Sequence, residues 1–246
     1  MKETDLDNDT TRNSGKLTRV ASAAILAVVL CAATYYWQRS GAIAAEQQAI
    51  GSLKAMRAIV VLDANRKHAE SINLSTVPPP SFDDAIEHLA ALHYARSVDL
   101  SRTKFNDAHC DAVSELKHIQ SLVLTETPLT DQGIARLVPR LRDLEALYLV
   151  GTQVTPRSAK TLSDLPSLTI LDLSRTSFDA GFDQIARLPR LEWLLLREND
   201  LGSSDLMPLS QAKSLTRISL EGATVQPSSV DALRKAKTGL IIEAED

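Results

Sequence analysis

The chain contains 246 residues, of which 44% are hydrophobic and 24% charged, a composition typical of one or two globular domains. Its formal net charge of −4 argues against nucleic acid as the main partner, because binding to phosphates requires a basic surface. The two cysteines, Cys31 and Cys110, provide neither a disulfide framework nor the ligand spacing of a zinc site.

An uncharged run at residues 20–37 follows a polar N-terminal tail, residues 1–19. As a helix this run would span roughly 27 Å, close to the thickness of the hydrocarbon layer of a bilayer. Tyr35, Tyr36 and Trp37 end the run, as aromatic residues do at a membrane interface. We therefore expect a transmembrane helix at residues 20–37, followed by a short tether at residues 38–45.

The flanking charges suggest an orientation for this helix. Lys16 and Arg19 precede the run closely and Arg39 follows it, so the weak excess of basic residues favours a cytoplasmic N-terminus. The chain is then a single-pass protein of the cell membrane, with its bulk outside the cytoplasmic membrane. The alternative is a signal peptide cleaved after residues 42–44, which would give a secreted or periplasmic protein.

From residue 69 onward the sequence repeats with a period of about 24 residues. Apolar residues recur two and five positions before an anchoring leucine, and the spacing of two indicates one face of a strand. The anchors are Leu74, Leu100, Leu124, Leu149, Leu173, Leu196 and Leu220.

The remainder of each repeat predicts a helix. Apolar residues recur there at helical spacing, and Cys110 shares a column with Ile134 and Val230, so we expect it to be a small buried hydrophobe. Residues of the types that cap helix N-termini begin these segments at Asn106, Thr130, Thr155 and Asp179.

The pattern LxxLxLxxT/NxL resembles the leucine-rich-repeat family, and residues 144–154, 168–178 and 191–201 match it in full. The closest resemblance is to bacterial membrane-anchored forms in which threonine replaces the usual asparagine. The resemblance implies an α/β solenoid of about seven repeats, with a parallel sheet on the concave side and helices on the convex side. The family asparagine forms hydrogen bonds between turns, and the resemblance implies that role for the hydroxyls of Thr103, Thr127, Thr152 and Thr176.

The repeats are expected to fill residues 69–239. The preceding segment, residues 46–68, is expected to be an N-terminal cap made of a short amphipathic helix, a strand at residues 59–62 and a turn. Residues 240–246 resemble a last strand whose acidic end protects the edge of the sheet.

The side chains that alternate with the buried strand residues should face outward on the concave sheet. In the C-terminal half they form an apolar patch with an aromatic anchor and an arginine rim, the composition of interface hot spots. We interpret it as a site for a protein or peptide, although aromatic residues also stack on sugars and envelope polysaccharide remains an alternative. Alternatively, the C-terminal cap or an edge loop covers the patch. The predicted site residues are Tyr148, Val150, Ile170, Asp172, Trp193, Leu195, Arg197 and Arg217.

The sequence contains no recognisable motif for catalysis or for cofactor binding. The five histidines lie between residues 68 and 118, but they form no HExxH motif, and His88 and His93 do not share a helix face. GxSxG, GxGxxG and GKS/GKT sequences are absent. The sequence therefore predicts a non-enzymatic protein with no metal and no cofactor.

The two accounts of the N-terminus differ in the mass of the mature chain. A single-pass protein should keep its N-terminal segment and remain in the membrane fraction. Intact-mass analysis of membrane and soluble fractions measures this directly. A chain that begins at Ala45 in the soluble fraction would instead favour signal cleavage.

Overall fold

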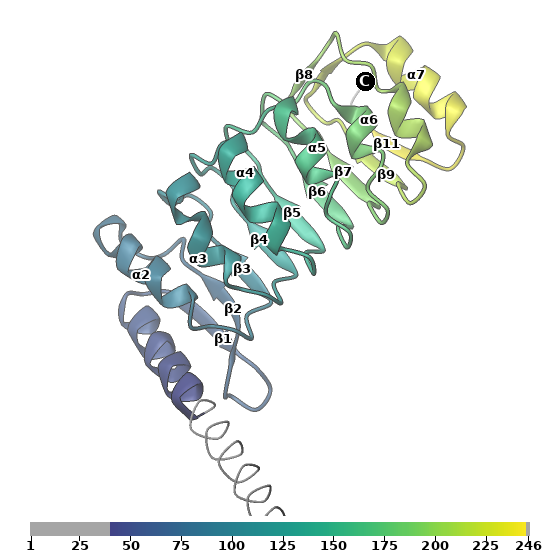
Figure 1. The fold of residues 1–246 in the computed structure, drawn as a ribbon. Coiled ribbons are helices and arrows are strands. Elements are labelled where there is room, and N and C mark those ends of the chain that lie inside the picture. The colour runs from purple at the N-terminus through teal and green to yellow at the C-terminus, as the bar shows by residue number, and fades with distance from the viewer. Residues whose placement is uncertain (1–39, 245–246) are drawn as a thin grey trace, which may run out of the picture. The chain divides into compact units, whose positions relative to one another are not determined.

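The computed structural model describes residues 40–244 (Figure 1). The chain divides into two units at residues 45 and 46. The second unit contains the repeats and is the one described here. Within residues 40–244, no helix is both long and apolar enough to cross a membrane. The transmembrane helix predicted at residues 20–37 lies outside the described residues.

Nine of the described strands form one sheet, in which they follow one another in the order of the chain. Two further short strands are not part of this sheet. The first strand pairs antiparallel with the second, and each later strand is parallel to its neighbour. The strands are β1 (Ile59–Leu62), β2 (Ala69–Asn73), β3 (Ser97–Asp99), β4 (Ser121–Val123), β5 (Ala146–Tyr148), β6 (Ile170–Asp172), β7 (Trp193–Leu195), β9 (Arg217–Ser219) and β11 (Ile241–Glu243). The two further strands, β8 (Asp200–Leu201) and β10 (Thr224–Val225), form a separate two-stranded sheet.

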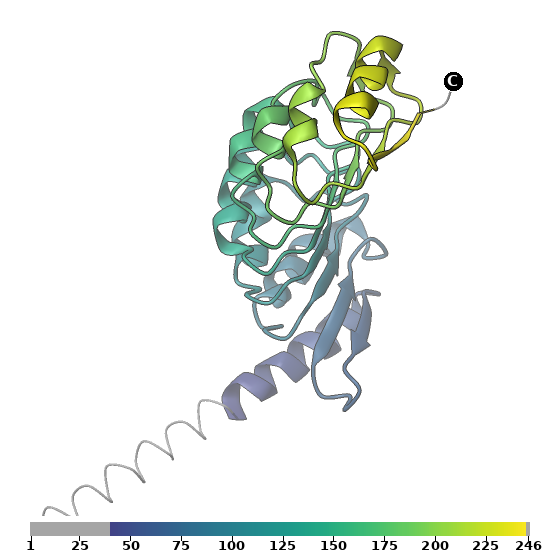
Figure 2. The same ribbon diagram turned by 90° about the vertical axis from the view of Figure 1, so that its right-hand side faces the viewer.

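Short helices form a second layer behind the sheet (Figure 2). Most have fewer than eight residues, so packing against the apolar core stabilises them more than intrinsic helix propensity does. The α-helices are α2 (Phe82–Leu89), α3 (Cys110–Ser114), α4 (Asp131–Leu137), α5 (Ala159–Leu162), α6 (Phe182–Ile185) and α7 (Pro227–Ala236). The 3₁₀ turns are η1 (Pro79–Ser81), η2 (Asp107–His109), η3 (Val138–Arg140), η4 (Pro156–Ser158) and η5 (Met207–Gln211).

One continuous core runs between the two layers. All seven anchoring leucines are buried in it, together with Ile72 of β2 and the central residues of β3, β4, β5, β6, β7 and β9. Each turn therefore covers the apolar face of its neighbours, as a repeat that cannot bury its own apolar face requires. Cys110 is fully buried in the same core, as its column predicted.

The segment before β2 closes the N-terminal end of this core. Residues 46–55 are helical and bury Ala49, Ile50 and Leu53. The buried carboxylate of Glu46 joins this helix to the start of β2, because it lies 2.7 Å from His68 Nδ1 and accepts a hydrogen bond from the Ala69 amide at 3.1 Å.

The threonine column corrects the expectation of hydrogen bonds between turns. Each of its hydroxyls donates within its own turn, to the leucine carbonyl three residues earlier, as Thr103 does to Leu100 at 2.6 Å and Thr152 does to Leu149 at 2.7 Å. Asn199, in the same column, does link turns: its Nδ2 donates to the Leu173 carbonyl at 2.9 Å. Asparagine reaches further than threonine and carries a separate donor and acceptor.

A second set of hydrogen bonds links the turns at the N-termini of the helices. Asp107 accepts from both the amide and the hydroxyl of Thr130, at 2.9 and 2.6 Å, and Asp131 does the same with Thr155. Thr130 in turn accepts from the Gln132 amide and so caps α4. Three of the four predicted capping residues act as caps, whereas Asp179 does not, because α6 begins after Gly181.

Replacing Asn199 tests the inter-turn link. Asn199→Ala removes the donor to Leu173 and the acceptor of the Thr176 amide, both in the core region. We expect a loss of about 2 kcal/mol in the free energy of unfolding, because buried polar groups are left unpaired. Chemical denaturation measures it.

Thr176→Val is the matched control, because it removes a hydroxyl that bonds only within its own turn. It should cost about 1 kcal/mol or less. Equal losses for the two variants would contradict the inter-turn role of Asn199.

Candidate binding surface on the concave face

The register of the parallel sheet places the predicted site residues in rows across neighbouring strands. One row contains Ala146, Ile170, Trp193, Arg217 and Ile241, and the next contains Tyr148, Asp172, Leu195, Ser219 and Glu243. Residues in register lie about 5 Å apart on adjacent strands, so members of a row are direct neighbours. The tertiary structure thus brings six of the eight predicted residues into two neighbouring rows.

Trp193 occupies the centre of the first row and is partly exposed. Ile170 lies beside it on β6, and the Arg217 guanidinium carbon lies 5.1 Å from the centre of its ring on the other side. The indole Nε1 is buried and has no hydrogen-bond partner in the described part of the chain. A buried indole N–H usually has a hydrogen-bond partner, so Trp193 Nε1 is an exception within the described residues.

Two predicted residues are less accessible than the alternation of the strands suggested. Leu195 is only 4% exposed and Asp172 only 3% exposed, so neither belongs to the open surface. Leu195 lies on the same face as the larger side chains of Trp193 and Arg197, which stand two residues before and after it. The carboxylate of Asp172, in register with Leu195, lies 3.6 Å from the Arg197 guanidinium. Tyr148, Val150, Ile170 and Arg217 are partly exposed.

A hollow of about 370 Å³ lies next to this surface, at the carboxyl ends of the strands. Four of its lining side chains are charged and belong to successive turns. The residues that line it are Val150, Ser174, Arg175, Arg197, Glu198, Glu221 and Gly222. Val150 and Arg197 were predicted as site residues, but Glu198 and Glu221 were not.

Two of the charged residues that line the hollow, Arg175 and Glu198, belong to a column that adopts a left-handed backbone in every turn from β3 to β9. Arg102, Glu126, Gly151, Arg175, Glu198 and Gly222 have φ values between 55 and 67°. Arg175 Nη1 donates to Glu126 Oε1 at 2.9 Å and crosses the intervening turn at Gly151, where no side chain obstructs it. The charges that alternate along this column at the repeat period were a signal present in the sequence.

Arg175 and Arg102 determine the protonation of Glu126. Hydrogen bonds from these two guanidinium groups, Arg175 first, lower the pKa of the Glu126 carboxyl below its ordinary value of 4.5. Glu126 is therefore ionised at neutral pH.

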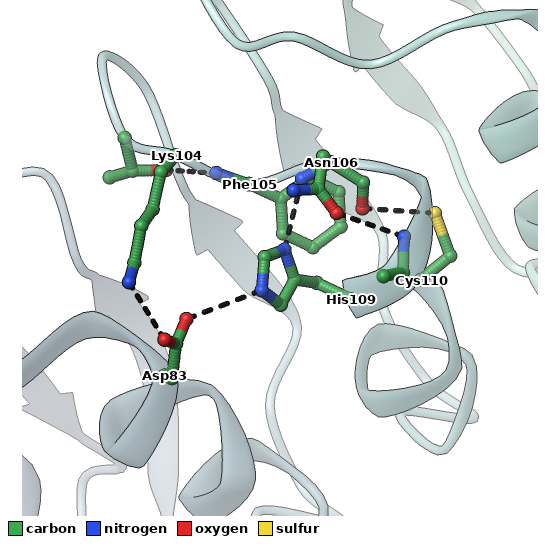
Figure 3. Close-up of polar contacts among 8 residues, drawn as sticks. Asp83, Lys104, Phe105, Asn106, His109 and Cys110 are labelled. Atoms are coloured by element: carbon green, nitrogen blue, oxygen red, sulfur yellow. Dashed lines mark hydrogen bonds and ion pairs between the residues drawn. The ribbon is translucent and has the colours of Figure 1, made fainter.

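Three of the five histidines, His68, His109 and His118, each contact a different carboxylate. His109 lies 3.3 Å from Asp83, which also binds Lys104 at 2.7 Å, and its Nδ1 accepts a hydrogen bond from the Asn106 amide (Figure 3). Within residues 40–244, no group of three or more potential ligands is placed to hold a metal ion. Burial raises the pKa of the Cys110 thiol to about 12, so this group stays protonated and is a poor nucleophile.

Comparison with known proteins supports the fold. No protein-family model and no curated protein sequence matches the chain. Among solved structures, the internalin InlF from Listeria monocytogenes matches with a TM-score of 0.51 and 19% identity over 65% of this chain and 44% of the internalin. The chain thus spans less than half the length of that protein. This likeness, together with the repeat architecture, confirms the leucine-rich-repeat fold.

Two further solved structures are similar at lower TM-scores. Internalin C2 from L. monocytogenes gives 0.47 with 19% identity, over 65% of this chain and 75% of that one. The plant peptide hormone receptor RGFR1, solved in complex with RGF2, gives 0.41 with 14% identity, over 64% of this chain and 26% of the receptor.

The ion pairs of Glu126 predict a dependence of stability on pH. Because its pKa is lowered in the folded chain, the contribution of Glu126 to stability is present above the pKa of the unfolded chain and is lost as the pH falls through the folded pKa. Glu126→Gln should therefore be less stable than wild type at pH 7, and this deficit should be smaller at pH 3. Urea denaturation at both pH values measures the difference.

Glu115→Gln is the control for this comparison, since Glu115 is exposed and forms no ion pair within the described residues. It should match wild type at both pH values. A Glu126→Gln deficit that persists unchanged at pH 3 would contradict the ionic origin.

Proposed function

We propose that this leucine-rich-repeat protein is a non-catalytic binding module that captures a protein or peptide on the C-terminal half of its concave face. The observation that supports this most is Trp193, a large, partly exposed aromatic side chain on β7 whose indole Nε1 has no hydrogen-bond partner among the described residues. Aromatic and arginine residues dominate the energetics of protein interfaces, and Arg217 is stacked against this ring.

The polar side chains of the concave face support binding rather than catalysis. Asn73 donates to Asp99 at 2.8 Å, and Asp172 accepts from the Ser174 amide at 2.9 Å. These groups hold one another and the strand ends in place. Among the described residues, none of these contacts pairs a nucleophile with a general base in the arrangement that covalent catalysis requires.

Membrane anchoring is part of the proposal. Residues 20–37 would hold the protein in the cytoplasmic membrane, and the repeats would bind their partner outside it. The support is the uncharged run with its aromatic end and the distribution of flanking basic residues.

The proposal predicts that capture of the partner depends on Trp193. In crosslinking experiments on native membranes, the full-length Trp193→Ala variant should retain less than a tenth of the partner, since hot-spot truncations cost about 2 kcal/mol or more. Denaturation curves check that the variant remains folded.

Tyr94→Ala is the matched control, because Tyr94 is an exposed aromatic residue that stacks on His68, away from the row of Trp193. It should capture the partner as wild type does. A partner retained by the Trp193 variant would place the binding site elsewhere, and capture of envelope polysaccharide alone would replace the proposed protein or peptide ligand.

A further inference from the structure

The two arginines of the hollow are each held by two carboxylates. Arg175 donates to Glu126 at 2.9 Å and lies 3.8 Å from Glu198. Arg197 lies 3.6 Å from Asp172 and 3.9 Å from Glu221. Both guanidinium groups therefore already have counter-ions on two sides.

The two glutamates of the hollow are held much more loosely. Glu198 and Glu221 each have one ion pair, at 3.8 and 3.9 Å, which exceeds direct hydrogen-bond distance. Their side chains are 65% and 50% exposed, and neither accepts a hydrogen bond from a residue that the structure describes. The unused capacity for hydrogen bonding thus lies mainly on the carboxylates.

An anionic ligand fits this hollow poorly. Asp172 has a side chain only 4% exposed, and Arg197 is its only cationic partner within the described residues. A ligand carboxylate that bound Arg197 would remove the counter-ion from a buried charge, and uncompensated buried charges are strongly destabilising. Two ionic networks meet at the hollow: one joins Arg102, Glu126, Arg175 and Glu198, and the other joins Asp172, Arg197 and Glu221. Among the described residues they contain four carboxylates and three guanidinium groups, and the excess carboxylate belongs to the network of Arg197.

We propose that the hollow binds a basic group of the partner, a guanidinium or a primary ammonium, between Glu198 and Glu221. These residues lie on successive turns, which are about 5 Å apart, so one guanidinium can contact both carboxylates. Gly222 and Ser174 leave the space open, and Val150 offers an apolar contact for the methylene stem of a lysine or arginine. The inference rests on the proposed function and names the chemistry of its partner.

The hollow has space because of its backbone as well as its side chains. Gly222 has a φ of 67°, and a Cβ there would lie 3.2 Å from Glu198 Cγ. A side chain at this position would crowd Glu198 and enter the hollow. Glycine at position 222 therefore allows both the left-handed backbone and the open space in the hollow.

The test uses N-acetyl-arginine amide and its neutral analogue N-acetyl-citrulline amide, titrated into the isotopically labelled full-length chain. Two-dimensional amide NMR spectra should show shifts at Glu198, Glu221 and Gly222 with the arginine probe. Citrulline should bind about threefold to tenfold more weakly, because it has the same shape without the charge. N-acetyl-glutamate amide should cause no saturable shift.

The double variant Glu198→Gln, Glu221→Gln should lose the preference for arginine over citrulline while remaining folded, since both side chains are exposed. Glu243→Gln is the matched control, because Glu243 pairs with Arg217 at 3.7 Å outside the hollow. It should keep the preference. Equal binding of arginine and citrulline, stronger binding of glutamate, or no binding of any probe would overturn the inference.

This experiment is independent of the natural partner. If the arginine probe fails but capture in membranes still requires Trp193, only the chemistry assigned to the hollow is wrong. If the probe binds as expected and Trp193→Ala captures the partner normally, the hollow is a cation site and the proposed concave-face function fails instead.

Discussion

The stacking of turns that cannot bury their own apolar faces is the constraint on which this structure depends. A unit of about 24 residues offers one strand, one short helix and a few leucines, too little to form a core alone. Neighbouring turns complete that core, and the central leucines of β4 to β7 are accordingly buried. Because each turn needs the next, the strands are held parallel and in register, and the surface side chains are repeated in rows.

The register of the sheet places residues that are one repeat apart in the sequence side by side on the surface. Residues 23 to 25 apart in the sequence, such as Ile170, Trp193 and Arg217, become direct neighbours on the sheet. The same translation links Arg175 to Glu198 and Arg197 to Glu221. The rows therefore place Trp193 beside the hollow. There, Arg175 and Arg197 are each paired with two carboxylates, whereas Glu198 and Glu221 each have one long ion pair among the described residues.

Different residues form the polar links between turns at different places in the solenoid. Asp107 and Asp131 connect turns at the helix N-termini, where their charges also suit the helix dipole. Asn199 connects turns in the core, whereas the threonines of the same column only close their own turns. Core packing and the backbone hydrogen bonds of the sheet thus hold most turns together. Side-chain hydrogen bonds between turns add to this at the N-termini of the helices.

The sequence by itself determined the repeat, its period, the buried columns and the side of the sheet on which Trp193 lies, because strand and helix periodicities are local properties of the chain. It also indicated three helix caps, since Asn106, Thr130 and Thr155 act on backbone groups two residues away. Only the tertiary structure decided that Leu195 and Asp172 are covered, that threonine does not bridge turns, and that Glu198 and Glu221 face a hollow. These depend on how far side chains reach across the roughly 5 Å between turns, a distance that no spacing along the chain expresses.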